Sequence, residues 1–92
     1  MVKIKGQLLV KNKMGLHARP CAQIVHTAEK FPKVKVTFSI NKEQANGRNI
    51  LEIMILAVCC NSWLEVTLEG PQQDCKNLWE ELQKLFANQF YE

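Results

Sequence analysis

Apolar and polar residues alternate along three stretches of the chain, and this period of two is typical of half-buried β-strands. The stretches are residues 2–10, 33–40 and 63–69. In the second, every other residue is valine, phenylalanine or isoleucine, with lysine, threonine and serine between them. After a turn at residues 41–43 we expect a short return strand at residues 44–47. The pattern therefore predicts four strands, each with one wet face.

Two other stretches repeat their apolar residues at steps of three and four, which is the spacing of one helical face. Residues 19–30 form the first, and Phe31-Pro32 ends it because the residue before a proline avoids the helical region. Its expected core face consists of Ala18, Cys21, Ala22, Val25 and Ala28. Residues 74–86 form the second, with Cys75, Leu78, Trp79, Leu82, Leu85 and Phe86 on its core face. Residues 49–58 are apolar at nearly every position and fit either a helix or a strand.

These elements follow one another as strand, helix, strand, strand, short helix, strand, helix. The order βαββαβα predicts an α+β fold with an antiparallel four-stranded sheet and the helices packed on one of its faces. Such a fold is an open-faced two-layer β-sandwich. The length of 92 residues predicts one domain over residues 1–92.

Charge and hydropathy exclude several classes of function. The formal net charge is +3, which favours an acidic partner or a phosphate but lacks the dense basic stripe of a nucleic-acid binder. The longest apolar run, residues 53–60, is far shorter than the roughly 20 residues of a membrane span. The N-terminal residues carry no apolar block of signal-peptide length. We therefore expect a cytoplasmic protein that neither inserts into a membrane nor binds nucleic acid.

The chain contains four cysteines, whose spacing argues against a metal site. Cys59 and Cys60 are neighbours, which cannot easily bridge each other, and no pair has zinc-ligand spacing. We expect free thiols in a reducing compartment and no cofactor. A thiol enzyme that uses Cys59 and Cys60 would lack a visible base.

The run Gly15 to Pro20 places a histidine where a loop leads into the first helix. The first N–H groups of a helix lack internal partners and bind anions, so Ala18 and Arg19 beside His17 form a candidate phosphate site. The Arg19 side chain would add charge-assisted hydrogen bonds. A neutral imidazole is also a nucleophile at cell pH. A single histidine near a helix start is more often a surface or capping residue, which is the alternative for His17. His26 lies nine residues further along, on the opposite side of the helix axis, and we interpret it as a solvated surface residue.

The residues GLHARP resemble the active-site signature of the histidine-containing phosphocarrier (HPr) family of the bacterial phosphoenolpyruvate-dependent phosphotransferase system. The resemblance continues through RPCAQIVHTAEKF, RNILEIMIL and LEVTLEGPQQD. It implies the βαββαβα sandwich and a monomeric phosphoryl carrier that is not an enzyme. His17 would take the phosphoryl group on Nδ1 from Enzyme I and pass it to an enzyme IIA, and Arg19 would assist the transfer.

The same resemblance implies a partner-docking surface after the third strand. Arg48 would flank this surface, and Ile50, Leu51 and Met54 would form its exposed apolar patch, although simple core packing also explains apolar helical positions. Asn49 stands where some relatives have a serine that a kinase phosphorylates, and Glu52 replaces a small or basic residue. A regulatory protein of the same fold that docks without transferring phosphate is the alternative function. The sequence leaves open whether the relay serves sugar uptake or nitrogen-related regulation.

Overall fold

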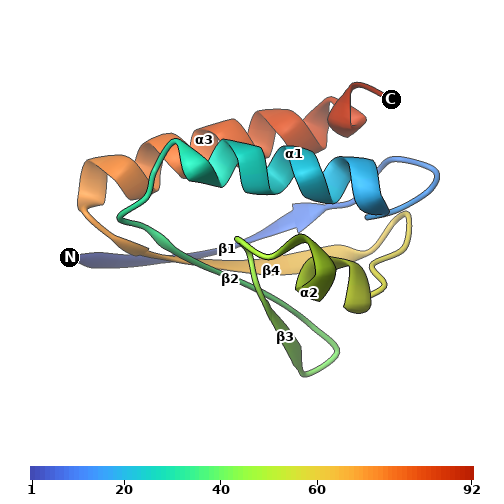
Figure 1. Cartoon of the computed structure of the whole chain (residues 1–92), viewed down its shortest axis with the longest axis horizontal. Coiled ribbons are helices and arrows are strands. Elements are labelled where there is room, and N and C mark those ends of the chain that lie inside the picture. Colours follow the sequence, from blue (N-terminus) through green and yellow to red (C-terminus); the bar gives the residue numbers. More distant parts are fainter.

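The computed structural model describes residues 1–92 and places four strands in one antiparallel sheet (Figure 1). The strands are β1 (Val2–Leu9), β2 (Lys35–Ile40), β3 (Glu43–Asn46) and β4 (Trp63–Gly70), in the sheet order β1-β4-β2-β3. The helices are α1 (Ala18–Glu29), α2 (Ile50–Ile55) and α3 (Gln72–Ala87), followed by a 3₁₀ turn, η1 (Gln89–Tyr91). Helices α1 and α3 lie side by side on one face of the sheet (Figure 1). The predicted open-faced α+β sandwich is confirmed.

The alternating stretches form strands because alternate side chains point to opposite faces of the sheet, one buried against the core and one exposed to solvent. In β4, Leu64, Val66 and Leu68 are buried, whereas Trp63 and Glu65 are exposed. The hairpin between β2 and β3 turns through two residues with positive φ, which matches the right-handed twist of the paired strands.

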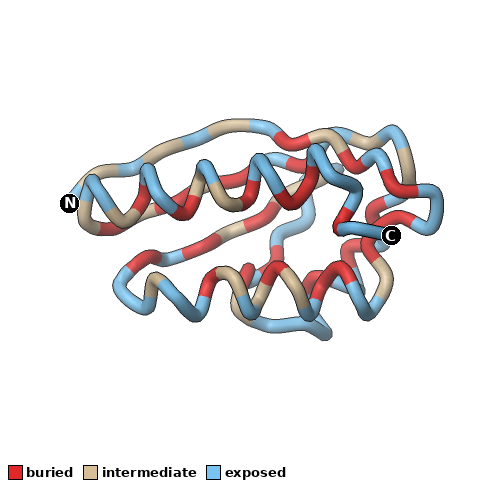
Figure 2. The backbone as a smooth tube through the Cα atoms, turned by 90° about the horizontal axis from the view of Figure 1, so that it is seen from above, coloured by how far each residue is buried: buried red, intermediate tan, exposed pale blue.

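The core face of α1 differs from the one expected. The buried residues are Pro20, Cys21, Ile24 and Ala28. Ala18 and Ala22 are exposed, so assigning them to the core was wrong. Ile24 carries more apolar surface than either alanine, and turning it toward the sheet keeps steps of three and four between Cys21, Ile24 and Ala28. Figure 2 shows buried positions recurring at regular intervals along the two long helices.

Helix α3 closely matches the predicted pattern, although it begins at Gln72, two residues earlier than expected. Five of its six expected core residues are buried, and Trp79 is half-buried. Its ring packs over Gly6 of β1, where an added Cβ would lie 2.5 Å from Trp79 Cη2. The missing side chain of Gly6 therefore allows α3 to approach the sheet closely.

The ambiguous stretch 49–58 is a short helix followed by a loop. The Asn49 side chain caps α2 by accepting a hydrogen bond from the Glu52 amide at 3.0 Å. The helix stops after six residues, and the chain turns away at Ala57, which has a φ of +52°. None of the helices combines the length and apolar character that crossing a membrane requires.

Candidate functional site

His17 is the N-cap residue of α1, directly before the first helical residue, Ala18. Its backbone is extended, with φ −85° and ψ −172°, and its side chain makes no capping bond to the helix. The loop before it is tied down by Asn12, whose buried amide donates to the Gly15 carbonyl at 2.6 Å. Gly15 takes a left-handed φ of +67°, and Leu16 N–H donates to the Val58 carbonyl at 2.9 Å. This loop fixes the point from which the imidazole projects.

The start of α1 offers unpaired donors next to His17. The amides of Ala18 and Arg19 donate to no group of the chain, and Pro20 has no N–H. The Arg19 side chain is exposed and makes no hydrogen bond, and the His17 side chain is 36% exposed. The three residues that the sequence singled out as a phosphate site therefore lie together at a helix N-terminus, where an anion is favoured.

A carboxylate from the far end of the chain contacts the imidazole. Glu92 Oε2 lies 2.6 Å from His17 Nε2, and Glu92 Oε1 accepts a hydrogen bond from Asn12 Nδ2 at 2.9 Å. Desolvation acts to raise the pKa of Glu92. The hydrogen bonds from Asn12 and His17 and the charges of His17 and Arg19 outweigh it, so the pKa lies below its usual value. Sequence reasoning missed Glu92, because no local pattern links residues 75 positions apart.

The irregular turn η1 positions Glu92 next to His17. Gln89, Phe90 and Tyr91 all have left-handed φ values, between 52° and 58°. Each such residue costs roughly 1–2 kcal/mol when it carries a side chain. The turn is held by Phe90, which is fully buried and meets the Phe86 ring edge-to-face at 4.8 Å. Gln23 of α1 also donates to the Phe90 carbonyl at 3.1 Å.

An exposed apolar surface adjoins the histidine. Ile50, Leu51 and Met54, the residues expected to dock partners, are 39%, 66% and 37% exposed. Met54 and His17 line the same hollow, which has a volume of about 370 Å³ and is also lined by Met14 and Leu16. Met14 and Ile55 are also exposed, at 73% and 68%, and sequence reasoning missed both. We call Met14, Ile50, Leu51, Met54 and Ile55 the apolar patch.

The structure does not bring Arg48 to His17. Its guanidinium donates to the carbonyls of Ala28 at 2.8 Å, of Val34 at 2.6 Å and of Phe31. These carbonyls lie in the last turn of α1 and in the loop just after it, whereas His17 caps the opposite end of that helix. The role of Arg48 visible here is to hold the end of α1 to the loop before β2.

The four cysteines are free, and they fall into two groups. Cys21 and Cys75 are buried; burial raises the pKa of Cys21 to about 11 and also raises that of Cys75. Cys59 is exposed and Cys60 half-buried, and both line the hollow beside His17. No group of three or more histidine, cysteine or acidic side chains could hold a metal ion. His26 is 80% exposed, with Nδ1 3.6 Å from Glu29.

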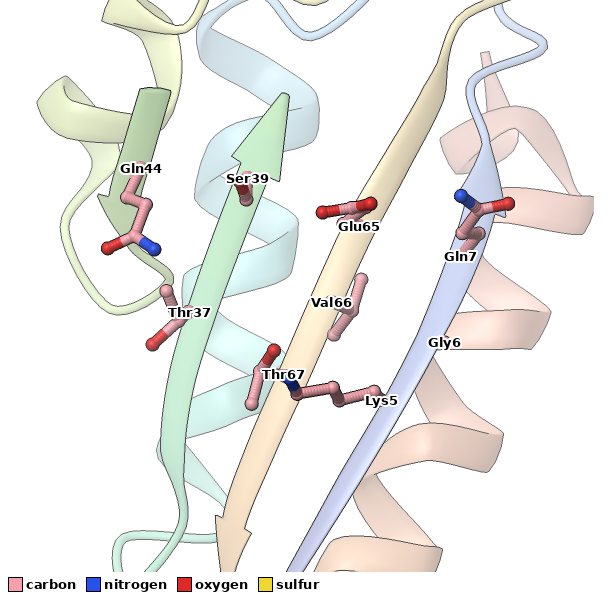
Figure 3. A pocket seen from close by; sticks show the side chains of 9 residues that line it. All are labelled: Lys5, Gly6, Gln7, Thr37, Ser39, Gln44, Glu65, Val66 and Thr67. Atoms are coloured by element: carbon pink, nitrogen blue, oxygen red, sulfur yellow. The ribbon is translucent and has the colours of Figure 1, made fainter. Parts of the chain in front are cut away.

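A second hollow, also of about 370 Å³, lies on the open face of the sheet (Figure 3). Its lining is mostly polar and includes Lys5, Gln7, Thr37, Ser39 and Glu65, whose side chains rise from the strands. It shares no residue with the hollow at His17. The polar hollow on the sheet therefore lies apart from His17.

Known proteins resemble this chain over nearly its whole length. A family model described as "PTS HPr component phosphorylation site" matches residues 4–88. The phosphocarrier protein HPr of Xylella fastidiosa is 34% identical over 89 residues, covering 97% of both chains. That of Treponema pallidum is 35% identical over 83 residues, covering 90% of this chain and 91% of its own. The crystal structure of HPr-C-His from Thermoanaerobacter tengcongensis superposes with a TM-score of 0.84 at 32% identity, covering all of this chain and 98% of that one.

Proposed function

Because the chain belongs to the HPr family of phosphocarrier proteins of the phosphotransferase system, we propose that His17 accepts a phosphoryl group from Enzyme I and passes it to an enzyme IIA. The observation that carries this proposal is the position of His17 beside two unpaired amides and Arg19. A member of this family is a phosphorylated intermediate between other proteins and not a catalytic enzyme. A cytoplasmic, monomeric carrier is part of the same proposal.

The residues at the helix start have distinct parts in this transfer. The Nδ1 lone pair of neutral His17 attacks phosphorus, the Nδ1–P bond forms, and the bond to the donor breaks with its electron pair. The amides of Ala18 and Arg19 then donate to the phosphoryl oxygens, and the Arg19 guanidinium balances their charge. Transfer onward repeats the step with the carrier as donor.

The apolar patch is the surface on which we propose that the partners dock. Five large apolar side chains exposed in one region exceed the scattered exposure that is normal for a surface. Met14 and Met54 line the same hollow as His17, so a partner seated there would meet the imidazole directly. Methionine adapts its shape to different surfaces, which suits a carrier with a donor and an acceptor.

Intact-mass measurement after incubation with phosphoenolpyruvate and Enzyme I tests the proposal. We expect one acid-labile phosphoryl group on the wild-type protein and on His26→Ala, and none on His17→Ala. His26 is the matched control, because it is the other histidine of the chain and is exposed on the same helix. Equal labelling of both variants would contradict the assignment of His17. A wild-type protein that binds Enzyme I without any mass gain would favour the docking regulator.

A further inference from the structure

The His17 side chain contacts one carboxylate, with its Nε2 2.6 Å from Glu92 Oε2. An ionised carboxylate can only accept hydrogen bonds, so the proton of this bond belongs to Nε2. In the neutral imidazole, the other nitrogen is then Nδ1 without a proton and with a free lone pair. The contact therefore selects which ring nitrogen can act as nucleophile.

The carboxylate itself is held in a defined orientation. Its second oxygen, Oε1, accepts from Asn12 Nδ2 at 2.9 Å, and Asn12 is buried and bonded to the loop that leads to His17. The Glu92 side chain is only 22% exposed. Asn12, Glu92 and His17 thus form a chain of hydrogen bonds in which each member fixes the next.

The backbone around Glu92 also indicates that its carboxylate is held in a fixed position. Three consecutive residues in left-handed conformation would not persist without compensating contacts. Those contacts are the buried Phe90 ring and the hydrogen bond from Gln23, a residue of α1, the helix that His17 caps. The turn is therefore fastened to α1, and Glu92 is fixed relative to the imidazole.

We propose that Glu92 is a positioning residue for phosphoryl transfer, which keeps the proton of His17 on Nε2 and stabilises the positive charge that the ring gains when Nδ1 is phosphorylated. This rests on the proposed function of His17. When the lone pair of Nδ1 forms the bond to phosphorus, the proton stays on Nε2 and the ring becomes cationic. The Glu92 carboxylate already faces that N–H, so no group has to reorganise as the charge appears.

Three variants separate the possible roles of this side chain. In Glu92→Ala both the acceptor and the charge are lost. Glu92→Gln retains an amide oxygen that can accept from Nε2–H but removes the charge. Glu29→Gln is the matched control, since Glu29 also lies next to a histidine, His26, on an exposed surface at 3.6 Å.

The first measurement is the ¹⁵N NMR spectrum of the unphosphorylated protein, which reports the tautomer of each histidine. We expect His17 of the wild type to carry its proton on Nε2, and Glu92→Ala to give a mixture of tautomers. Glu92→Gln should retain the wild-type tautomer, and Glu29→Gln should leave His17 unchanged. An unaltered His17 spectrum in Glu92→Ala would overturn the proposal.

The second measurement is the rate of phosphorylation by Enzyme I and phosphoenolpyruvate. We expect Glu92→Ala to slow it by about tenfold to hundredfold, the range that one hydrogen bond to a charged group accounts for, and Glu92→Gln to slow it less. Equal or faster phosphorylation of Glu92→Ala, with His17 of the wild type labelled normally, would overturn the positioning role and leave the carrier function intact. If His17 of the wild type is never phosphorylated, the carrier function fails, and the tautomer measurement alone decides whether Glu92 orients the ring.

Discussion

Arg19 and Arg48 have the same charge in opposite surroundings. Arg19 is exposed and donates to no group of the protein, so its guanidinium is available to an incoming phosphoryl group. Arg48 is half-buried and donates to three backbone carbonyls. The sequence analysis placed both at the functional surface, but only the guanidinium of Arg19 has all of its N–H groups without a partner in the protein.

The two arginines should therefore differ in what their loss affects. We expect Arg48→Ala to lower the free energy of unfolding by roughly 2 kcal/mol, because several charge-assisted hydrogen bonds disappear. Arg19→Ala should change it by less than about 0.5 kcal/mol, the usual effect of an exposed substitution, but should slow phosphorylation of His17. Urea unfolding and the Enzyme I assay measure the two effects. A fully stable Arg48→Ala that associates slowly with Enzyme I would contradict this structural role and support the docking role expected from the sequence.

The thiols should show a similar division into two groups. The raised pKa of Cys21, about 11, and the burial of Cys75 keep both thiols protonated and inaccessible, whereas Cys59 and Cys60 open onto the hollow at His17. At pH 8 we expect an aromatic disulfide reagent to modify Cys59 and Cys60 first, and the other two only after unfolding. Mass spectrometry of the digested protein identifies the sites. Rapid modification of Cys21 in the folded protein would contradict its burial.

The cysteines are not expected to take part in phosphoryl transfer. Cys59→Ser should keep the exposed surface polar and small, so it should accept phosphate at close to the wild-type rate. Loss of transfer in a variant that retains the wild-type circular dichroism would show that a thiol participates.

At the scale of elements, α2 is the helix that packs least against the rest of the protein. Of its six residues only Ile53 is fully buried, and the exposed ones include Ile50, Leu51 and Met54. An apolar helix with one buried residue gains little from the core, and its exposed apolar side chains exceed what core packing explains. This is the structural reason for placing the docking surface here.

Two substitutions in α2 test whether its exposed residues bind partners while its buried residue stabilises the fold. Leu51→Glu puts a charge at a position that is 66% exposed, so we expect a change in stability below about 0.5 kcal/mol and a marked loss of transfer from Enzyme I. Ile53→Ala removes a fully buried side chain and should cost about 2–5 kcal/mol. Thermal unfolding and titration against Enzyme I measure both. If Leu51→Glu unfolds the protein, the residue belongs to the core; if it folds and transfers normally, the partners dock elsewhere.

How much of this could be predicted from the sequence depends on how local each signal is. The strands and α3 followed from alternation and helical spacing, which are properties of neighbouring residues. The core face of α1 was partly wrong, because steps of three and four fit both Ala22 and Ile24 and only packing chooses between them. The end of α2 was hidden because Ala57 adopts a left-handed turn without glycine. The hydrogen bonds of Arg48 and Glu92 could not be predicted, since their partners lie 14 to 80 residues away in the sequence.

At the scale of the whole molecule, the two layers separate two surfaces with different chemistry. The helical layer presents the start of α1, the apolar patch and His17 together. The open face of the sheet presents polar side chains and mixed charges, including the Lys3–Glu69 ion pair at 3.1 Å. The formal net charge of +3 favours an acidic partner, and we propose that the apolar patch fixes where that partner binds.

Two lysines, one on each surface, allow this separation to be tested with two variants of equal net charge. Lys13 lines the hollow at His17, and Lys5 lines the hollow on the sheet. Changing either to glutamine lowers the formal net charge from +3 to +2, so any difference between the variants reflects position. At low ionic strength we expect Lys13→Gln to associate with Enzyme I roughly two- to fivefold more slowly, as for one exposed ion pair of up to about 1 kcal/mol, and Lys5→Gln to match the wild type. Stopped-flow association rates between low and physiological salt measure this, and the difference should shrink as salt screens the charges. Equal slowing by both variants would mean that net charge alone steers the encounter and that the surface around His17 has no special part in it.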